Sequence, residues 1–370
     1  MSRTELRTLL AIAASAFALR AGAAVLTEYR PLFPSYYYTD AQFADREARK
    51  LLGLIDEPPA TSSLSHRAHA AFTALIYRAS GPRPLAPKLV NALAASLGVL
   101  AFGVFACGIF GFRAGAASAG LLTLWPSHVF FTSQNFKEGL VCGALMGAWL
   151  LLAPAGKRRE PRAAAAGLAL LGLLGALRAP VMLAAAAVFV HPRLGRRGLA
   201  ALLLVACLAV PLVFRAAPAA ITEYRRSRQH SESLYALSNG REVGTFLFPD
   251  EKMSSWLDVL AFIPKASFHV LFMPLPGLFP MEGKPGRMLA AAENAVLLAL
   301  VLLASAAALR LGPAPALLAP LLFFAAMTLG SSVMELDLGG ASRHKLMYCP
   351  MLFPFAVDEF FRLTGRGRRS

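Results

Sequence analysis

The sequence is short of acidic residues and of cysteine. It has 21 Asp and Glu against 37 Lys and Arg, and only 16% of its 370 residues are charged. So few charges beside 56% hydrophobic residues exclude an ordinary soluble globular protein. The cysteines lie inside or beside apolar stretches, which predicts buried thiols rather than a disulfide framework or a metal site. They are Cys107, Cys142, Cys207 and Cys349.

Several catalytic patterns are also missing. There is no Gly-rich loop of the kind that cradles phosphate, no Ser-centred nucleophile motif and no His, Cys and carboxylate spacing typical of a metal site. Neither a soluble domain nor a repeat of fixed period is recognisable. Any chemistry must therefore depend on polar residues at the ends of the apolar segments.

Long apolar blocks dominate the sequence, and its mean hydropathy is +0.54. Blocks of roughly 18 or more apolar residues are long enough to cross a bilayer as helices. The short alternating segments of a membrane β-barrel are not seen. We therefore predict an all-α polytopic membrane protein with about ten transmembrane helices and interfacial helices in its first external loop.

The net charge of +16 and the pI of about 10.3 fit the same prediction. Lys and Arg concentrate in short loops beside the apolar blocks, as the positive-inside rule expects of cytoplasmic loops. This favours membrane topology, not nucleic-acid binding, as the source of the charge. Arg3 and Arg7 place the N-terminus in the cytoplasm, and the arginine-rich end after Phe361 returns there.

One integral membrane domain is expected over residues 1–370. Its predicted parts are a catalytic module over 1–214 with an external loop over 27–88, an external or interfacial region over 215–287, and C-terminal helices over 288–370. Within the module, we expect the apolar stretch Ala163–Val190 to split into two short spans, because Pro180 interrupts the helical pattern. Prolines also interrupt Trp256–Pro280, which we expect to be interfacial or re-entrant.

Charged residues collect on the predicted external side at the ends of spans, where such charges tend to be functional or paired. Asp40 follows the first span and precedes an amphipathic run, so it reads equally well as a helix cap. Arg178 stands alone between two apolar runs and needs an anionic partner. The run from Arg343 to Lys345 is basic on an external edge, against the charge rule, which favours anion binding as much as a structural role.

Five short motifs resemble the C-type superfamily of polytopic membrane glycosyltransferases, in the bacterial branch of protein-O-mannosyltransferase-like and aminoarabinose-transferase-like enzymes. They occur in the family's order along most of the chain. The motifs are Tyr-Tyr-Thr-Asp40, Lys88-Leu-Val-Asn91-Ala-Leu, Trp125-Pro126 followed by Lys137-Glu138, Leu177-Arg178-Ala-Pro180, and Arg343-His344-Lys345 followed by Pro350.

The resemblance implies an inverting transfer of a sugar from a polyprenyl-phosphate donor to an acceptor hydroxyl, at the periplasmic face of a bacterial inner membrane. Asp40 would be the general base. The cations that would bind the donor phosphate are Lys137, Arg178, Arg343 and Lys345. Supporting roles would fall to Tyr38, His66, Lys88, Glu138 and His344.

Partners and cofactors are only partly indicated. The implied partners are the lipid-linked donor, a glycan, lipid or protein acceptor, and membrane lipids, with no nucleic acid. Some relatives use a divalent metal and others do not, and the sequence leaves this open. Two other functions also stay open: a glycan polymerase or ligase, and a transporter or flippase for a lipid-linked glycan.

Overall fold

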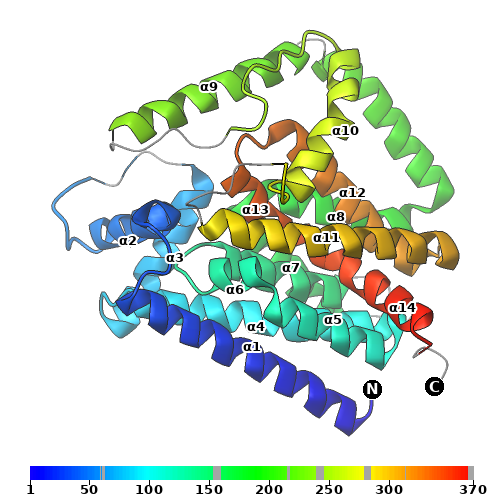
Figure 1. Ribbon diagram of the computed structural model, residues 1–370, viewed down its shortest axis with the longest axis horizontal. Helices are drawn as coiled ribbons and strands as arrows, with labels where there is room; N and C mark the ends of the chain where they lie inside the picture. The colour runs from blue at the N-terminus through cyan, green and yellow to red at the C-terminus, as the bar shows by residue number, and fades with distance from the viewer. Residues whose placement is uncertain are drawn as a thin grey trace.

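The computed structural model describes residues 1–58, 60, 63–152, 160–214, 217–238, 246–278, 285–312 and 314–365, and these ranges are almost entirely helical (Figure 1). An isolated bridge between Phe246 and Asp337 is the one β-type pairing found in them. The first half contains α1 (Arg3–Tyr29), η1 (Ser35–Tyr38), α2 (Thr39–Leu51), α3 (Leu64–Ser80), α4 (Leu85–Phe110), α5 (Phe112–Leu124), α6 (Pro126–Thr132) and α7 (Glu138–Leu152). The second half contains α8 (Pro161–Phe214), α9 (Ala217–Ser238), α10 (Trp256–Phe272), α11 (Pro285–Leu311), α12 (Pro315–Met334), α13 (Leu338–Tyr348), η2 (Cys349–Leu352) and α14 (Phe353–Leu363).

Five of the described helices are long and apolar enough to cross a bilayer: α1, α4, the Pro161–Phe189 part of α8, α11 and the Ala316–Met334 part of α12. The shorter α7 is also apolar. The chain is thus a helical membrane protein. The count of about ten spans stays a prediction.

The central helices approach closely because α7 presents glycines at four-residue intervals. A Cβ atom on Gly143 would lie 2.5 Å from the carbonyl oxygen of Ala94 on α4, and one on Gly139 would lie 2.7 Å from that of Asn91. Small residues at this spacing let two membrane helices pack backbone to backbone. This contact fixes the first residue of α7, Glu138, against the middle of the bundle.

The break between α5 and α6 follows from Pro126, which has no N–H to donate to the carbonyl of Leu122 one turn earlier. Arg20 of α1 replaces that donor. Its guanidinium lies 3.4 Å from the Leu122 oxygen, 3.0 Å from Thr132 Oγ1 and 2.7 Å from His128 Nδ1. A buried arginine therefore supplies hydrogen bonds to the backbone of the interrupted helix inside the bundle.

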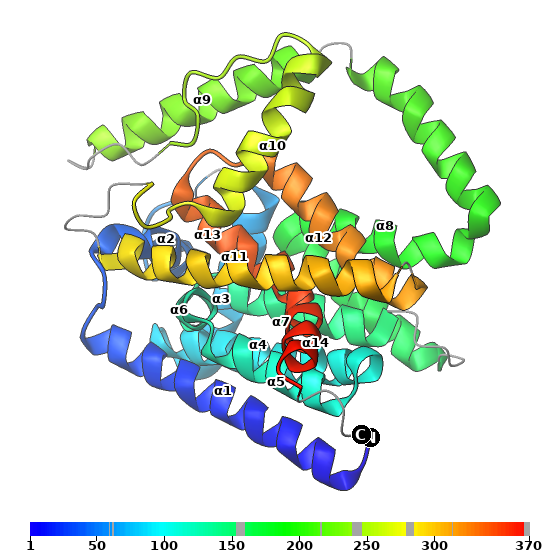
Figure 2. The same ribbon diagram turned by 45° about the vertical axis from the view of Figure 1, so that its right-hand side comes forward.

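The predicted break at Pro180 is wrong, since α8 continues through this residue along a bent course (Figure 2). Proline is tolerated within membrane helices when neighbouring side chains satisfy the freed backbone groups. Here Ser65 on α3 donates a hydrogen bond of 2.5 Å to the carbonyl of Leu177, which is next to the Ala176 carbonyl that the proline leaves without its helical donor. Arg178 consequently lies inside a continuous helix and not at a loop apex.

The first predicted external loop is helical, as expected. α2 and α3 pack on each other, and α2 is amphipathic with buried Ala41, Ala44 and Ala48. Trp256–Pro280 contains the helix α10, which packs against α12; residues 279–280 lie outside the described ranges.

Candidate functional site

Four charged side chains from four helices form one chain of ion pairs. Asp40 in the first turn of α2 accepts a 2.6 Å hydrogen bond from Arg343 on α13. Arg343 also reaches Glu138 at the start of α7, at 3.0 Å, and Glu138 accepts a further bond of 2.8 Å from Arg178 on α8. The fold thus brings together residues up to 303 positions apart.

His344 extends this chain on one side. It lies between Arg178, which contacts Nε2, and Glu335, which contacts Nδ1. Because arginine only donates, Nε2 must accept, and the imidazole proton on Nδ1 is donated to Glu335. His344 therefore helps to orient the Arg178 guanidinium, whose other terminal nitrogen contacts Glu138.

Lys137 borders the same site from the loop before α7. Its ammonium donates a 2.7 Å hydrogen bond to Ser65 Oγ. Asp40, His66, Lys137 and Arg343 line one small cleft together with His69, Phe43, Ala44 and Phe136. The cleft thus places two cations beside the Asp40 carboxylate.

Burial and the neighbouring charges shift the pKa values of the titratable groups in the cleft. Burial raises the pKa of Asp40, but the charge of Arg343 and its hydrogen bond outweigh this and hold the pKa below its ordinary value. Burial, followed by the charge of Arg178, lowers the pKa of Lys137 to about 8. Burial also lowers the pKa of His69 to about 4. At neutral pH the cleft contains a carboxylate, an ammonium and a neutral His69.

Several buried polar atoms of the site have no hydrogen-bond partner among the described residues. Glu138 is fully buried, and its Oε2 atom has no hydrogen-bond partner in the described part of the chain. The same holds for Nε of Arg178, Nε of Arg343 and Nε2 of His69. Buried polar groups are nearly always satisfied in native proteins, so such a cluster indicates a place for a ligand or ordered water.

Three residues predicted for the site lie elsewhere. Lys345 is 4% exposed and donates to Asn294 Oδ1 at 2.6 Å and to the carbonyl of Leu271 at 3.0 Å. Lys88 forms an ion pair of 2.8 Å with Glu28, and Tyr38 lines the same separate cavity as Lys88. The structure groups Asp40, Lys137, Glu138, Arg178, His66, Arg343 and His344.

Sequence reasoning missed Ser65, which positions Lys137, and Arg20, which holds the broken helix. Arg20 had a usable signal, because a lone arginine within an apolar span is costly unless it has partners. Ser65 carried none, since single serines are common in helices at membrane surfaces.

The described residues were also compared with the ligand sets of metal sites. Among the parts of the chain described above, no group of three or more His, Cys, Asp or Glu is placed to hold a metal ion. The site combines three cations with two carboxylates. Arg178 and Arg343 are ion-paired to Asp40 and Glu138, and Lys137 is hydrogen-bonded to Ser65 beside them. Comparison with known proteins yields no match to any protein-family model, curated protein or solved structure.

Proposed function

We propose that this chain is a membrane glycosyltransferase that moves a sugar from a polyprenyl-phosphate donor to an acceptor hydroxyl on the outer face of the membrane. One observation carries the proposal: the Asp40–Arg343–Glu138–Arg178 network, whose buried polar atoms are not all partnered. Four of the five motifs behind the sequence resemblance meet here: they contribute Asp40, Glu138, Arg178 and Arg343 to the network and Lys137 to the adjoining cleft.

The cations suit the leaving group. When the bond between the anomeric carbon and the phosphate oxygen breaks, negative charge grows on the polyprenyl phosphate. Arg178, Arg343 and Lys137 would stabilise that charge, and positioned cations of this kind supply a large share of catalysis in sites shielded from water. Glu138 holds both arginines in place before the donor arrives.

Asp40 suits the acceptor. In this mechanism the acceptor oxygen attacks the anomeric carbon from the face opposite the phosphate, and its proton passes to Asp40. Arg343 keeps Asp40 in the carboxylate form at neutral pH, so it can accept a hydrogen bond from the hydroxyl. The products are the inverted glycoside, polyprenyl phosphate and a protonated Asp40.

The direct test is transfer by the purified protein in phosphatidylcholine nanodiscs. Polyprenyl-phosphate donors with radiolabelled mannose, glucose or arabinose are incubated with the protein and a membrane extract of its host that supplies acceptors. The proposal expects one donor to release polyprenyl phosphate, with label in a new glycan. Retention of all label on every donor, by protein whose folding is confirmed by its melting transition, would refute it.

A further inference from the structure

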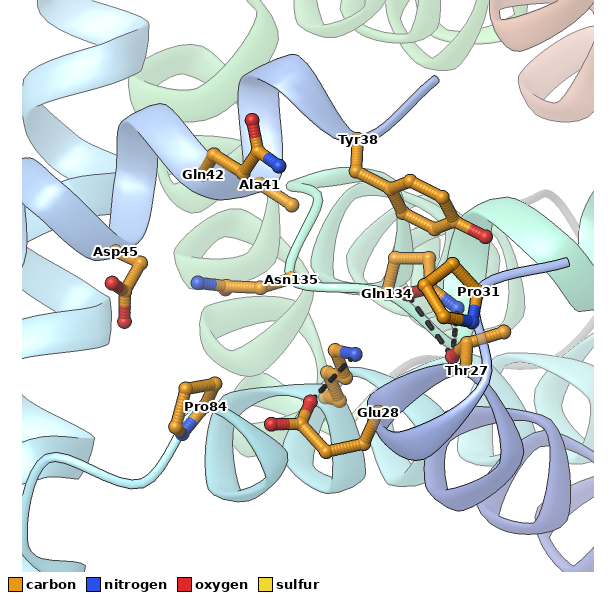
Figure 3. A pocket seen from close by; sticks show the side chains of 11 residues that line it. Thr27, Glu28, Pro31, Tyr38, Ala41, Gln42, Asp45, Pro84, Gln134 and Asn135 are labelled. Carbon is orange, nitrogen blue, oxygen red and sulfur yellow. Dashed lines mark hydrogen bonds and ion pairs between the residues drawn. The ribbon is translucent and has the colours of Figure 1, made fainter. Parts of the chain in front are cut away.

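A second cavity of about 340 Å³ lies on the other side of α2 from the Asp40 cleft. It is lined by the end of α1, the start of α4, α2 and the loop before α7 (Figure 3). The neighbours Asp40 and Ala41 diverge here, since Asp40 lines the cleft and Ala41 lines the cavity. Its volume falls within the range of about 300–1,000 Å³ typical of small-ligand sites.

The charges of this cavity are already compensated. Lys88 is paired with Glu28 at 2.8 Å. The other lining carboxylate, Asp45, is paired with Arg49 at 2.9 Å and also accepts a hydrogen bond from Tyr77. A phosphate would meet two carboxylates and one engaged cation, and an amine would find both carboxylates engaged. The lining therefore favours a neutral ligand.

The remaining polar groups of the lining are the amides of Gln42, Gln134 and Asn135 and the hydroxyls of Thr27 and Tyr38. Asn135 is 3% exposed; its Oδ1 accepts a hydrogen bond from Thr73, and its Nδ2 has no partner among the described residues. Figure 3 shows this side chain extending beneath α2 toward Asp45, with the amide of Gln42 above it and the ring of Tyr38 across the cavity. Amides that donate and accept, beside an aromatic ring, match the hydroxyl groups and apolar face of a sugar ring.

We infer that this cavity binds a neutral sugar ring of the acceptor. The inference rests on the proposed function and adds the acceptor class to it. The donor sugar is attached to its phosphate and must stay beside the cations of the Asp40 cleft, whereas the cavity has one cation, and that cation is paired. A sugar ring here would lie across the first turns of α2 from Asp40, so it would be a ring next to the one whose hydroxyl attacks.

The test measures binding without turnover. Saturation-transfer NMR is recorded on the protein in phosphatidylcholine nanodiscs, which avoid maltoside detergents that would compete. The probes are methyl glycosides of glucose, mannose and galactose, with glucosamine and glucose 1-phosphate as charged counterparts. For a ligand of this size we expect a Kd on the order of 1 mM.

Three variants locate the signal. Gln42→Trp fills the cavity from α2, and Asn135→Ala removes the unpartnered amide. Ala79→Trp adds the same indole to an exposed position of α3 outside the cavity and serves as the matched control. We expect saturable binding of at least one neutral glycoside, weakened about tenfold or more by Gln42→Trp and by Asn135→Ala, and unchanged by Ala79→Trp.

The opposite results are equally clear. No binding of any neutral glycoside, tighter binding of a charged probe, or binding that survives Gln42→Trp would overturn the inference. Since no donor is present, these outcomes are independent of transfer. If the protein transfers sugar but binds no neutral glycoside, only the acceptor-site inference is refuted. If it binds glycosides but never transfers sugar, only the proposed reaction is refuted.

Discussion

Arg343 donates a 2.6 Å hydrogen bond to Asp40 across 303 positions of sequence, and it also contacts Glu138 at 3.0 Å. One guanidinium thus joins α2 to the C-terminal part of the bundle. It also sets the charge state of Asp40, whose pKa it holds below the ordinary value against the effect of burial. The pair therefore links the assembly of the site to its chemistry.

Replacing Arg343 should impair the reaction and shift its pH dependence. Without the guanidinium, burial acts unopposed by this partner and the pKa of Asp40 rises. The carboxylate form then exists only at higher pH, so the acidic limb of the kcat/KM profile of Arg343→Gln should move upward. We also expect activity to fall by about 10²–10³-fold, as for loss of one charge-stabilising donor. In Arg343→Lys, which keeps the positive charge, the acidic limb should stay at a lower pH than in Arg343→Gln. An unmoved limb in Arg343→Gln would contradict the assigned pair.

Lys137 should set the alkaline limit. Its pKa is lowered to about 8, so the ammonium is present below this pH and is lost as pH rises through it. If the ammonium stabilises the leaving phosphate, kcat/KM of the wild type should decline above pH about 8. Arginine stays charged over this range. Lys137→Arg should therefore extend activity to higher pH, while Lys137→Met should be impaired at every pH. An alkaline decline identical in wild type and Lys137→Arg would exclude Lys137 as its cause.

Glu138 should matter for stability as well as for activity. It is fully buried between Arg178 and Arg343. Its removal leaves two partly buried guanidinium groups without their shared anion, and breaking a buried pair in this way costs about 3–5 kcal/mol. Glu138→Ala should thus lower the melting temperature of the nanodisc-embedded protein clearly. Glu138→Gln, which keeps an oxygen acceptor, should lower it less. Equal melting temperatures for wild type and Glu138→Ala would show that the buried network does not stabilise the fold.

Arg20 should be a purely structural residue. It donates to the Leu122 carbonyl that Pro126 leaves open, and also to Thr132. Arg20→Met leaves buried acceptors unsatisfied, at about 1–3 kcal/mol for each group. We expect a lower melting temperature with unchanged KM in the folded fraction. A change in KM without a change in melting temperature would instead assign Arg20 to the substrate path.

The sequence was sufficient to predict the helical membrane class and the convergence of the Asp40, Lys137, Arg178 and Arg343 segments. Long apolar blocks and the charges at their ends carry that information. It was not sufficient for Lys345, which follows two grouped residues yet points to Asn294. Neighbouring positions on a helix face different directions, and only the packing of α13 shows which of them faces the site.

The continuity of α8 was also beyond local reasoning. Pro180 predicts a break, but the helix continues through it, and Ser65 hydrogen-bonds the carbonyl of Leu177, 112 positions away, in the turn before the proline. The cavity lined by Gln42, Asn135 and Lys88 was similarly unforeseen, because it forms between four segments whose polar residues look ordinary in sequence. Long-range partners decided each of these outcomes.

The most direct measurement of the central claim is glycan and lipid analysis of a deletion strain complemented with wild type or with Asp40→Asn. Membrane levels of the two proteins are matched by immunoblot, and Ala79→Trp serves as a surface control. The account predicts that wild type and Ala79→Trp restore the missing glycan, whereas Asp40→Asn leaves it absent and its polyprenyl-linked donor accumulated. Full restoration of the glycan by Asp40→Asn would contradict the role of Asp40 as the general base.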